Sequence, residues 1–376
     1  MASTLTGCRI FTGDAMIADH AVRFEGARVL AIVPRREIPS TDDVADLGGG
    51  ILAPGFIDVQ ANGGGGTLLN SEPTPEGVRN IAAAHRKFGT VGLLPTVITD
   101  TPVVMARAIA AVREARAAGC ASVLGIHVEG PFLDKQRKGA HDPALIRPIT
   151  DADVDLLTNA RCGKLMLTLA PNRVPPQTVR ELARRGVLVS LGHAEATMAE
   201  AQAALDAGAA AFTHLYNAMS QLTGREPGMV GAALSDPHAF IGLIADGHHV
   251  HDAALKLAIA AAGGSRIMLI TDAMSSAAGG PDRFMLQGRE VRLVNDRLQL
   301  ADGTLAGSNL TMDAAVRYCV NTLGIDLADT LRMASLNPAR FLGVDGELGR
   351  IGPGTRASLV HLDNDLRVTK TWVEGQ

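Results

Sequence analysis

Four residues that lie far apart in this sequence have side chains suited to metal-assisted hydrolysis. Glu129, His193, His214 and Asp272 each stand where a short apolar run stops and a loop begins, in HVEGPF, VSLGHAE, FTHLYNAM and LITDAMS. In a parallel barrel the reaction chamber is lined by the carboxyl ends of the strands, so these four side chains are expected to meet there. One Glu and two His leave an open position for water on a divalent ion, and a separate Asp can carry a proton.

Each of these residues also has a structural interpretation when it is taken alone. Glu129 could be a structural carboxylate, either histidine could be a hydrogen-bonded core residue, and Asp272 could cap a loop. Their combination at successive strand ends is what favours a metal site. His127 shares the face of Glu129 but lies one layer deeper, so we expect it in the barrel interior and not as a ligand. Glu195 is expected on the turn after His193, in contact with solvent.

The end of the first barrel strand carries two amides, in DVQANGGGG. Alternate residues of a strand face the same way, so Gln60 and Asn62 could both point into the chamber. Amides are poor ligands for a divalent transition metal, so a second metal is not expected here. Lys164 lies at the amino end of the fourth strand and cannot supply a bridging ligand. The glycine run after Asn62 lacks a following Lys-Ser or Lys-Thr pair, and we interpret it as a flexible loop.

Eight short apolar strands are expected to alternate with helices over residues 51–345, which we assign to a catalytic domain. The strands are predicted in GILAPGFIDV, VGLLPTVI, SVLGIHVE, KLMLTLA, GVLVSLGH, AAFTHL, AFIGLIAD and RIMLITDA. Ala-rich helical stretches such as PEGVRNIAAAHRKFG and TMAEAQAALDAG separate most of them, and several end in Gly. This pattern favours an α/β protein with a closed (β/α)₈, TIM-like barrel.

The two ends of the chain are expected to form one small discontinuous β domain. Residues 1–50 alternate short apolar runs with turn residues, and residues 346–376 offer two more strands. The 376 residues suit one barrel with such an accessory domain. Residues 283–300 predict a hairpin inserted after the last barrel strand. Helices over 309–323 and 327–342 would complete the outer ring.

Charge and cysteine content argue against several classes of protein and partner for this chain. The formal net charge of −4 gives no reason to expect a nucleic-acid or membrane partner. The 4 cysteines are scattered without CxxC spacing, which predicts reduced thiols in a cytoplasmic protein. No secretory leader and no apolar run of membrane-spanning length is recognised. Any anionic substrate must therefore be held by local groups.

Nine segments, in this order, resemble the N-acetylglucosamine-6-phosphate deacetylases of the amidohydrolase superfamily: PGFIDVQANGGGG, HVEGPFL, KGAHDP, LGHAEAT, THLYNAM, GREPGMVGA, ADGHHV, LITDAM and TLAGS. The resemblance implies that Glu129, His193 and His214 bind the catalytic metal and that Asp272 is the general base and acid. His141, in KGAH, would lie near the acetyl carbonyl and polarise it. The substrate contacts that the resemblance implies are Ala140, His141, Asn217, Ala218, Arg225, His249, Leu305, Ala306 and Gly307.

These implied contacts suit a phosphorylated amino sugar. The planar donor fork of Arg225 fits a phosphate dianion, and His249 could add a second donor. Outside its GREPG motif, Arg225 would be interpreted as a surface salt-bridge residue. The roles of His248 and His251 stay open. The resemblance also implies a homodimer in which Arg225 reaches the neighbouring subunit's site.

The reaction implied by the resemblance is hydrolysis of N-acetyl-D-glucosamine 6-phosphate to D-glucosamine 6-phosphate and acetate. It would use one divalent metal ion per subunit, Zn²⁺ in first place and Fe²⁺ or another divalent ion as alternatives. A different amidohydrolase substrate, such as an N-acyl amino acid or a cyclic amide, stays open, although it lacks a phosphate for Arg225 to bind. A non-catalytic scaffold also stays open, but the presence of all four strand-end residues, from Glu129 to Asp272, argues against it. Acceptance of galactosamine analogues is left undecided.

Overall fold

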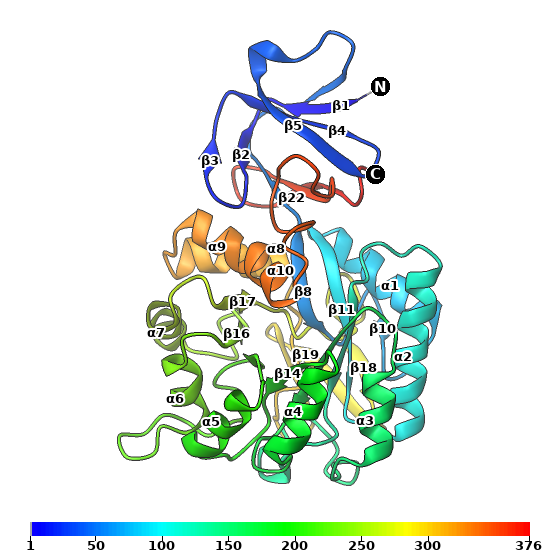
Figure 1. Cartoon of the computed structure of the whole chain (residues 1–376), viewed down its shortest axis with the longest axis vertical. Coiled ribbons are helices and arrows are strands. Elements are labelled where there is room, and N and C mark those ends of the chain that lie inside the picture. Colours follow the sequence, from blue (N-terminus) through cyan, green and yellow to red (C-terminus); the bar gives the residue numbers. More distant parts are fainter. Residues whose placement is uncertain (1) are drawn as a thin grey trace.

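Eight parallel strands form the centre of the protein, which is seen here in a computed structural model that describes residues 2–376 (Figure 1). In order around the sheet they are β8 (Phe56–Ala61), β11 (Thr90–Ile98), β12 (Gly125–Glu129), β13 (Lys164–Leu169), β14 (Leu188–Leu191), β15 (Ala211–Phe212), β16 (Phe240–Leu243) and β17 (Ile267–Leu269). Their spatial order follows the chain, as parallel β/α units require. All eight predicted runs therefore contribute a barrel strand.

The sheet closes where the chain beyond β17 meets β8. The backbone amide of Asp272 donates to the carbonyl of Gln60 at 2.9 Å, and Ala61 forms a parallel bridge with Ala273. Below them, the Thr271 hydroxyl donates to the buried carboxylate of Asp58 at 2.5 Å. These contacts form a seam between the first and the last barrel strand. The predicted TIM-like barrel is confirmed.

Ten α-helices surround the strands in the part of the chain that the structure describes. They are α1 (Pro75–Arg86), α2 (Pro102–Ala117), α3 (Asp151–Thr158), α4 (Pro176–Arg184), α5 (Met198–Asp206), α6 (Gly228–Ser235), α7 (Asp252–Ala262), α8 (Met312–Arg317), α9 (Leu327–Ala334) and α10 (Leu336–Phe341). Thr74, Thr101, Thr150 and Thr197 cap α1, α2, α3 and α5, because each hydroxyl accepts from a backbone amide of the first turn. The helix predicted over 327–342 is broken at Ser335 (φ −135°), and a π-helical turn follows α8. No helix among residues 2–376 is long and apolar enough to cross a bilayer.

The two termini come together in a small domain of two sheets at the top of Figure 1. One sheet has the order β5 (Arg28–Pro34), β4 (His20–Glu25), β1 (Ser3–Thr6) and β6 (Asp43–Asp46). The other has the order β22 (Val368–Trp372), β21 (Leu359–Leu362), β7 (Ile51–Pro54), β2 (Arg9–Phe11) and β3 (Met16–Ile17). Strand β7 falls within the range 51–345 that was expected to be barrel, yet it pairs with β2 and β21. The run GILAPGFIDV is split at Gly55, where any Cβ would collide with the Val91 side chain.

Two further short sheets lie beside the barrel. The predicted hairpin over 283–300 is a three-stranded antiparallel sheet of β18 (Arg283–Leu286), β19 (Arg289–Val294) and β20 (Arg297–Gln299). The glycine run, predicted as a flexible loop, instead forms part of the hairpin of β9 (Gly63–Gly64) and β10 (Thr67–Leu68). It is packed against α1, because the His85 ring bonds the Gly63 carbonyl at 2.8 Å. This part of the prediction was wrong.

Candidate metal centre and active site

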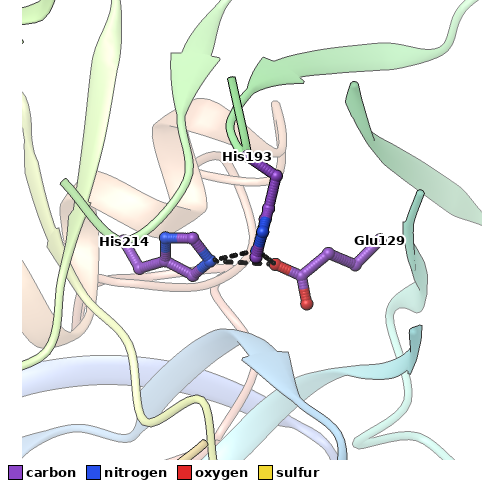
Figure 2. A group of neighbouring side chains, drawn as sticks. All are labelled: Glu129, His193 and His214. Atoms are coloured by element: carbon purple, nitrogen blue, oxygen red, sulfur yellow. Dashed lines mark hydrogen bonds and ion pairs between the residues drawn. The ribbon is translucent and has the colours of Figure 1, made fainter. Parts of the chain in front are cut away.

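Three side chains converge on one point from the ends of β12, β14 and β15, and Figure 2 shows them pointing toward one another. The Nε2 atom of His214 lies 3.0 Å from Glu129 Oε1 and 3.0 Å from His193 Nε2. The third separation, from His193 Nε2 to Glu129 Oε1, is 3.3 Å. All three residues are buried, and they are the one group of three or more potential ligand side chains found among residues 2–376. The structure thus brings together the predicted ligand set.

The chemistry of these atoms fits a divalent cation. His193 Nδ1 lies 2.9 Å from the carbonyl oxygen of Arg137, which can only accept, so Nδ1 carries the proton of the neutral ring. Its Nε2 lone pair then faces the carboxylate of Glu129, and two acceptors in contact repel unless a cation lies between them. Tetrahedral ligands about 2.0–2.1 Å from Zn²⁺ are roughly 3.3 Å apart, close to the separations seen.

Electrostatics keep the acidic ligand ionised. Burial alone would raise the pKa of Glu129, but the neighbouring His193 and His214 rings hold the pKa of this carboxyl well below its usual range. His127 is different, because burial lowers its pKa to about 4 and its Nε2 is 2.7 Å from the Thr168 hydroxyl. It lies in the barrel interior, as predicted, and outside the ligand group.

The backbone at three of the four strand-end residues is left-handed. The φ angles are 48° at His193, 29° at His214 and 51° at Asp272. A non-glycine residue in this region costs of order 1–3 kcal/mol and persists only where the surrounding structure holds it. The strand ladders on one side and the loop contacts on the other hold these residues in place.

Asp272 lies beside this group and is held by two amides. Its Oδ1 accepts from Gln60 Nε2 at 3.1 Å and from Asn62 Nδ2 at 2.7 Å, and Gln60 Nε2 is also 3.2 Å from Glu129 Oε1. Burial and the negative charge of Glu129 raise the pKa of Asp272. A carboxylate with a raised pKa is a stronger base than an ordinary one.

His141 approaches the same point from the loop after β12. Its Nε2 is 4.0 Å from Glu129 Oε2, and its ring meets the His193 ring edge-on at 4.4 Å between centroids. Burial and the neighbouring His193 set the pKa of His141 well below its usual value, so the ring is neutral. A neutral imidazole still has one N–H that can donate to a substrate oxygen.

A cavity of about 400 Å³ opens onto these groups, within the usual range for a small-molecule site. The predicted contacts that line it are Ala140, His141, Asn217, Ala218, His249, Leu305, Ala306 and Gly307. Arg225 is the exception: it is exposed on the loop 221–227, which projects at the lower left of Figure 1 just before α6, and it does not line this cavity.

Several lining residues were not predicted, namely Ile98, Gln136, Arg137, Gly139, Met274, Leu286 and Thr304. Arg137 directly precedes the KGAH segment, and that neighbourhood was the one available signal for it. Its side chain pairs with Glu195, which therefore lies away from the ligand group, as expected. Leu286 comes from the inserted sheet and looks like an ordinary core residue in the sequence.

The three histidines after β16 have separate roles. His249 lines the cavity, and its Nδ1 is 2.6 Å from Asp246 Oδ2, which orients the ring. His248 accepts from Arg297 Nε at 3.2 Å. His251 caps α7, because its Nδ1 accepts from a backbone amide of the first turn. Only His249 of the three lines the cavity.

Comparison with known proteins gives full-length matches. The family model described as "Amidohydrolase family" matches residues 51–376, and that described as "NagA composite domain" matches residues 4–52. A curated N-acetylgalactosamine-6-phosphate deacetylase from Escherichia coli O157:H7 is 41% identical, over 100% of this chain and 99% of its own length.

Two solved structures match equally completely. An N-acetylglucosamine-6-phosphate deacetylase from Pasteurella multocida has a TM-score of 0.97 and 34% identity, covering 100% of this chain and 99% of that one. The Mycobacterium smegmatis enzyme, an Asp-to-Ala mutant in complex with N-acetyl-D-glucosamine-6-phosphate, has a TM-score of 0.93 and 32% identity, covering 100% and 98%. With its barrel and strand-end ligand group, the chain belongs to the amidohydrolase family.

Proposed function

We propose that this protein is a metal-dependent deacetylase of N-acetyl-D-hexosamine 6-phosphates, with N-acetyl-D-glucosamine 6-phosphate as its substrate and D-glucosamine 6-phosphate and acetate as products. The observation that carries the proposal is the cavity in which Asp272, a carboxyl of raised pKa, lies beside the group of Glu129, His193 and His214. The full-length similarity to an enzyme in complex with this sugar phosphate supports the choice of substrate.

One divalent ion per subunit would be held by Glu129 Oε1, His193 Nε2 and His214 Nε2. When bound, it supplies the Lewis acidity that activates water near neutral pH. We propose Zn²⁺ ahead of Fe²⁺, because a carboxylate and two imidazoles with one open position are a common catalytic zinc set. The amides of Gln60 and Asn62 direct their N–H groups at carboxylates, and this argues against a second ion there.

The proton transfers fall to Asp272. As the water oxygen bonds to the acetyl carbon, the carboxylate takes a proton from that water. It then gives the proton to the sugar nitrogen as the C–N bond breaks, so the nitrogen leaves as a neutral amine and not as an amide anion. The N–H of His141 donates to the acetyl oxygen while negative charge develops on it.

The phosphate end of the substrate is assigned to the other side of the cavity. His249 is oriented by Asp246, and Asn217 and Ala218 line the same cavity. Arg225 is exposed, so we propose that it serves the cavity of a second subunit in a homodimer. We also propose a cytoplasmic location, in keeping with four cysteines that are all free.

N-acetyl-D-galactosamine 6-phosphate is a second candidate substrate. The E. coli relative bears that name and is 41% identical, against 34% for the Pasteurella enzyme named for the glucosamine substrate. The two sugars differ only in the orientation of one hydroxyl, so a single polar contact could separate them.

The test is acetate release from both sugar phosphates and from N-acetylglucosamine without its phosphate. Metal-stripped enzyme is compared with enzyme reconstituted with Zn²⁺ or Fe²⁺. We expect activity only after reconstitution and a strong preference for a phosphorylated substrate. Equal rates without the phosphate would overturn the substrate class, and full activity of stripped enzyme would overturn the metal dependence. Exclusive hydrolysis of the galactosamine compound would select the second candidate.

A further inference from the structure

The amides of Gln60 and Asn62 both contact the same oxygen of the Asp272 carboxylate. Gln60 Nε2 lies 3.1 Å and Asn62 Nδ2 lies 2.7 Å from Oδ1. No group among residues 2–376 donates a hydrogen bond to Oδ2, and Asp272 lines the cavity. The two oxygens of this carboxylate therefore have different surroundings.

We propose that Gln60 and Asn62 are positioning residues that hold Oδ1 of Asp272 and leave Oδ2 as the oxygen that exchanges protons with water and with the sugar nitrogen. The inference rests on the proposed deacetylase function and adds to it separate roles for the two oxygens of one carboxylate. A carboxylate that rotates freely presents either oxygen, whereas one fixed in place stays in hydrogen-bonding geometry for both transfers.

The orientation of the two amides follows from their neighbours. Gln60 Nε2 bridges two carboxylates, since Glu129 Oε1 is 3.2 Å away on its other side. A flipped amide would place its oxygen against both anions, so the donor must face them. The opposite ends, Gln60 Oε1 and Asn62 Oδ1, are buried without a partner among residues 2–376. Leaving two acceptors unpaired destabilises a fold, so these amides are arranged for their N–H contacts and not for stability.

The backbones that carry donor and acceptor are also fixed to each other. The Asp272 amide donates to the Gln60 carbonyl at 2.9 Å, across the barrel seam. Asp58 Oδ1 accepts from the backbone N–H of Gln60 at 3.1 Å and from the backbone N–H of Thr271 at 3.3 Å. Thus the seam fixes the backbone positions from which the two side-chain amides reach the carboxylate.

Asn62 provides the cleaner test, because its side-chain amide contacts only Asp272 whereas Gln60 also contacts a proposed metal ligand. Asn62→Leu keeps the approximate shape and removes the donor, and Asn62→Ala serves if Leu is too bulky. Losing a hydrogen bond to a charged group predicts a fall in kcat of roughly 10- to 100-fold. We expect KM, bound metal and thermal unfolding to stay close to those of the unaltered enzyme.

A double-mutant cycle separates positioning from simple packing. In an Asp272→Ala background, Asn62→Leu should cause no further loss of the residual rate, measured with excess enzyme. Gln202→Met on α5 is the control, because Gln202 Nε2 likewise donates to a carboxylate, Asp206 Oδ1, at 2.9 Å. It should leave kcat unchanged.

Two results would overturn the inference while leaving the function intact. One is unchanged kcat in both Asn62 variants, and the other is an equal loss in the presence and absence of Asp272. If the unaltered, metal-loaded protein releases no acetate from either sugar phosphate, the proposed function itself fails. That result is seen before any variant is made, so the two failures are distinguishable.

Discussion

Replacing Asp272 with Asn removes a base and leaves the rest of its contacts in place. The amide oxygen of an Asn can occupy the position of Oδ1 and accept from Gln60 and Asn62, as the carboxylate does at 3.1 and 2.7 Å. The new NH₂ group takes the place of Oδ2, the oxygen that the two amides leave free, in a residue that lines the cavity. The change also removes a negative charge that the neighbouring Glu129 disfavours. We therefore expect Asp272→Asn to fold and to bind metal.

The expected loss is large because one group serves both proton transfers. General acid–base catalysis by a positioned side chain contributes about 10²–10⁴-fold, which corresponds to about 2.7–5.5 kcal/mol of the barrier. Both the attack of water and the departure of the amine use Asp272. The upper part of the range, a fall in kcat of about 10³–10⁴-fold, is therefore predicted. KM should change little, because the substrate contacts assigned elsewhere in the cavity remain.

The assay measures acetate release at saturating substrate, with metal content determined on the same samples. Asp206→Asn, which removes an exposed carboxylate on α5, is the matched control and should behave as the unaltered enzyme does. Near-normal turnover of Asp272→Asn would refute the assignment of the base. Loss of metal from this variant would instead show that Asp272 is a ligand, contrary to the geometry described above.

Three further changes test other parts of the structure. His193→Ala removes one of the three proposed ligands. Loss of a residue that only orients a ligand lowers metal affinity by roughly 10- to 100-fold, so loss of a ligand should lower it at least as much, as measured by titration with a chelator. Full retention of metal would contradict the ligand set. Arg225→Ala should raise KM for the sugar phosphate about 10-fold or more while the rate with the unphosphorylated sugar is unchanged, and an equal effect on both would argue against a phosphate contact. Asp58→Asn tests pH-dependent stability. Burial raises the pKa of Asp58 to about 7, so the folded state keeps its proton while the unfolded state releases it from about pH 4 upward. The free energy of unfolding should fall as pH rises from about 4 to 7, and Asp58→Asn should remove this pH dependence. The measurement is urea unfolding at several pH values. If the unaltered protein and the variant show the same dependence on pH, the pKa of Asp58 is not raised in the folded state.

The convergence of the four strand-end residues could be predicted because its signal is local. Each residue ends an apolar run that is recognisable within six or seven positions, and the topology of a parallel barrel brings strand ends together whatever their separation in sequence. Glu129, His193, His214 and Asp272 therefore needed no knowledge of tertiary contacts. The eight strands were predictable for the same reason.

Other features depend on contacts that no local pattern encodes. The split of the first run at Gly55 follows from the approach of Val91, and the third strand of the insert follows from its packing beside the cavity. The carbonyl oxygen of Arg137 orients His193, but every residue has such an oxygen, so residue type carries no signal for it. The sequence places Gln60 in the chamber, yet which carboxylates it contacts is decided by the register of the seam.

The seam also bears on the order in which the site is assembled. The three proposed ligands come from β12 and from the ends of β14 and β15, which lie within one continuous run of neighbouring strands. The contact between Gln60 and Asp272 joins residues 212 positions apart. Bringing the first and last barrel strands together costs more chain entropy than pairing adjacent strands, so it is expected to be slower. A refolding chain should therefore regain its affinity for metal before it regains turnover, which makes activity a stricter criterion than metal content for a fully closed barrel.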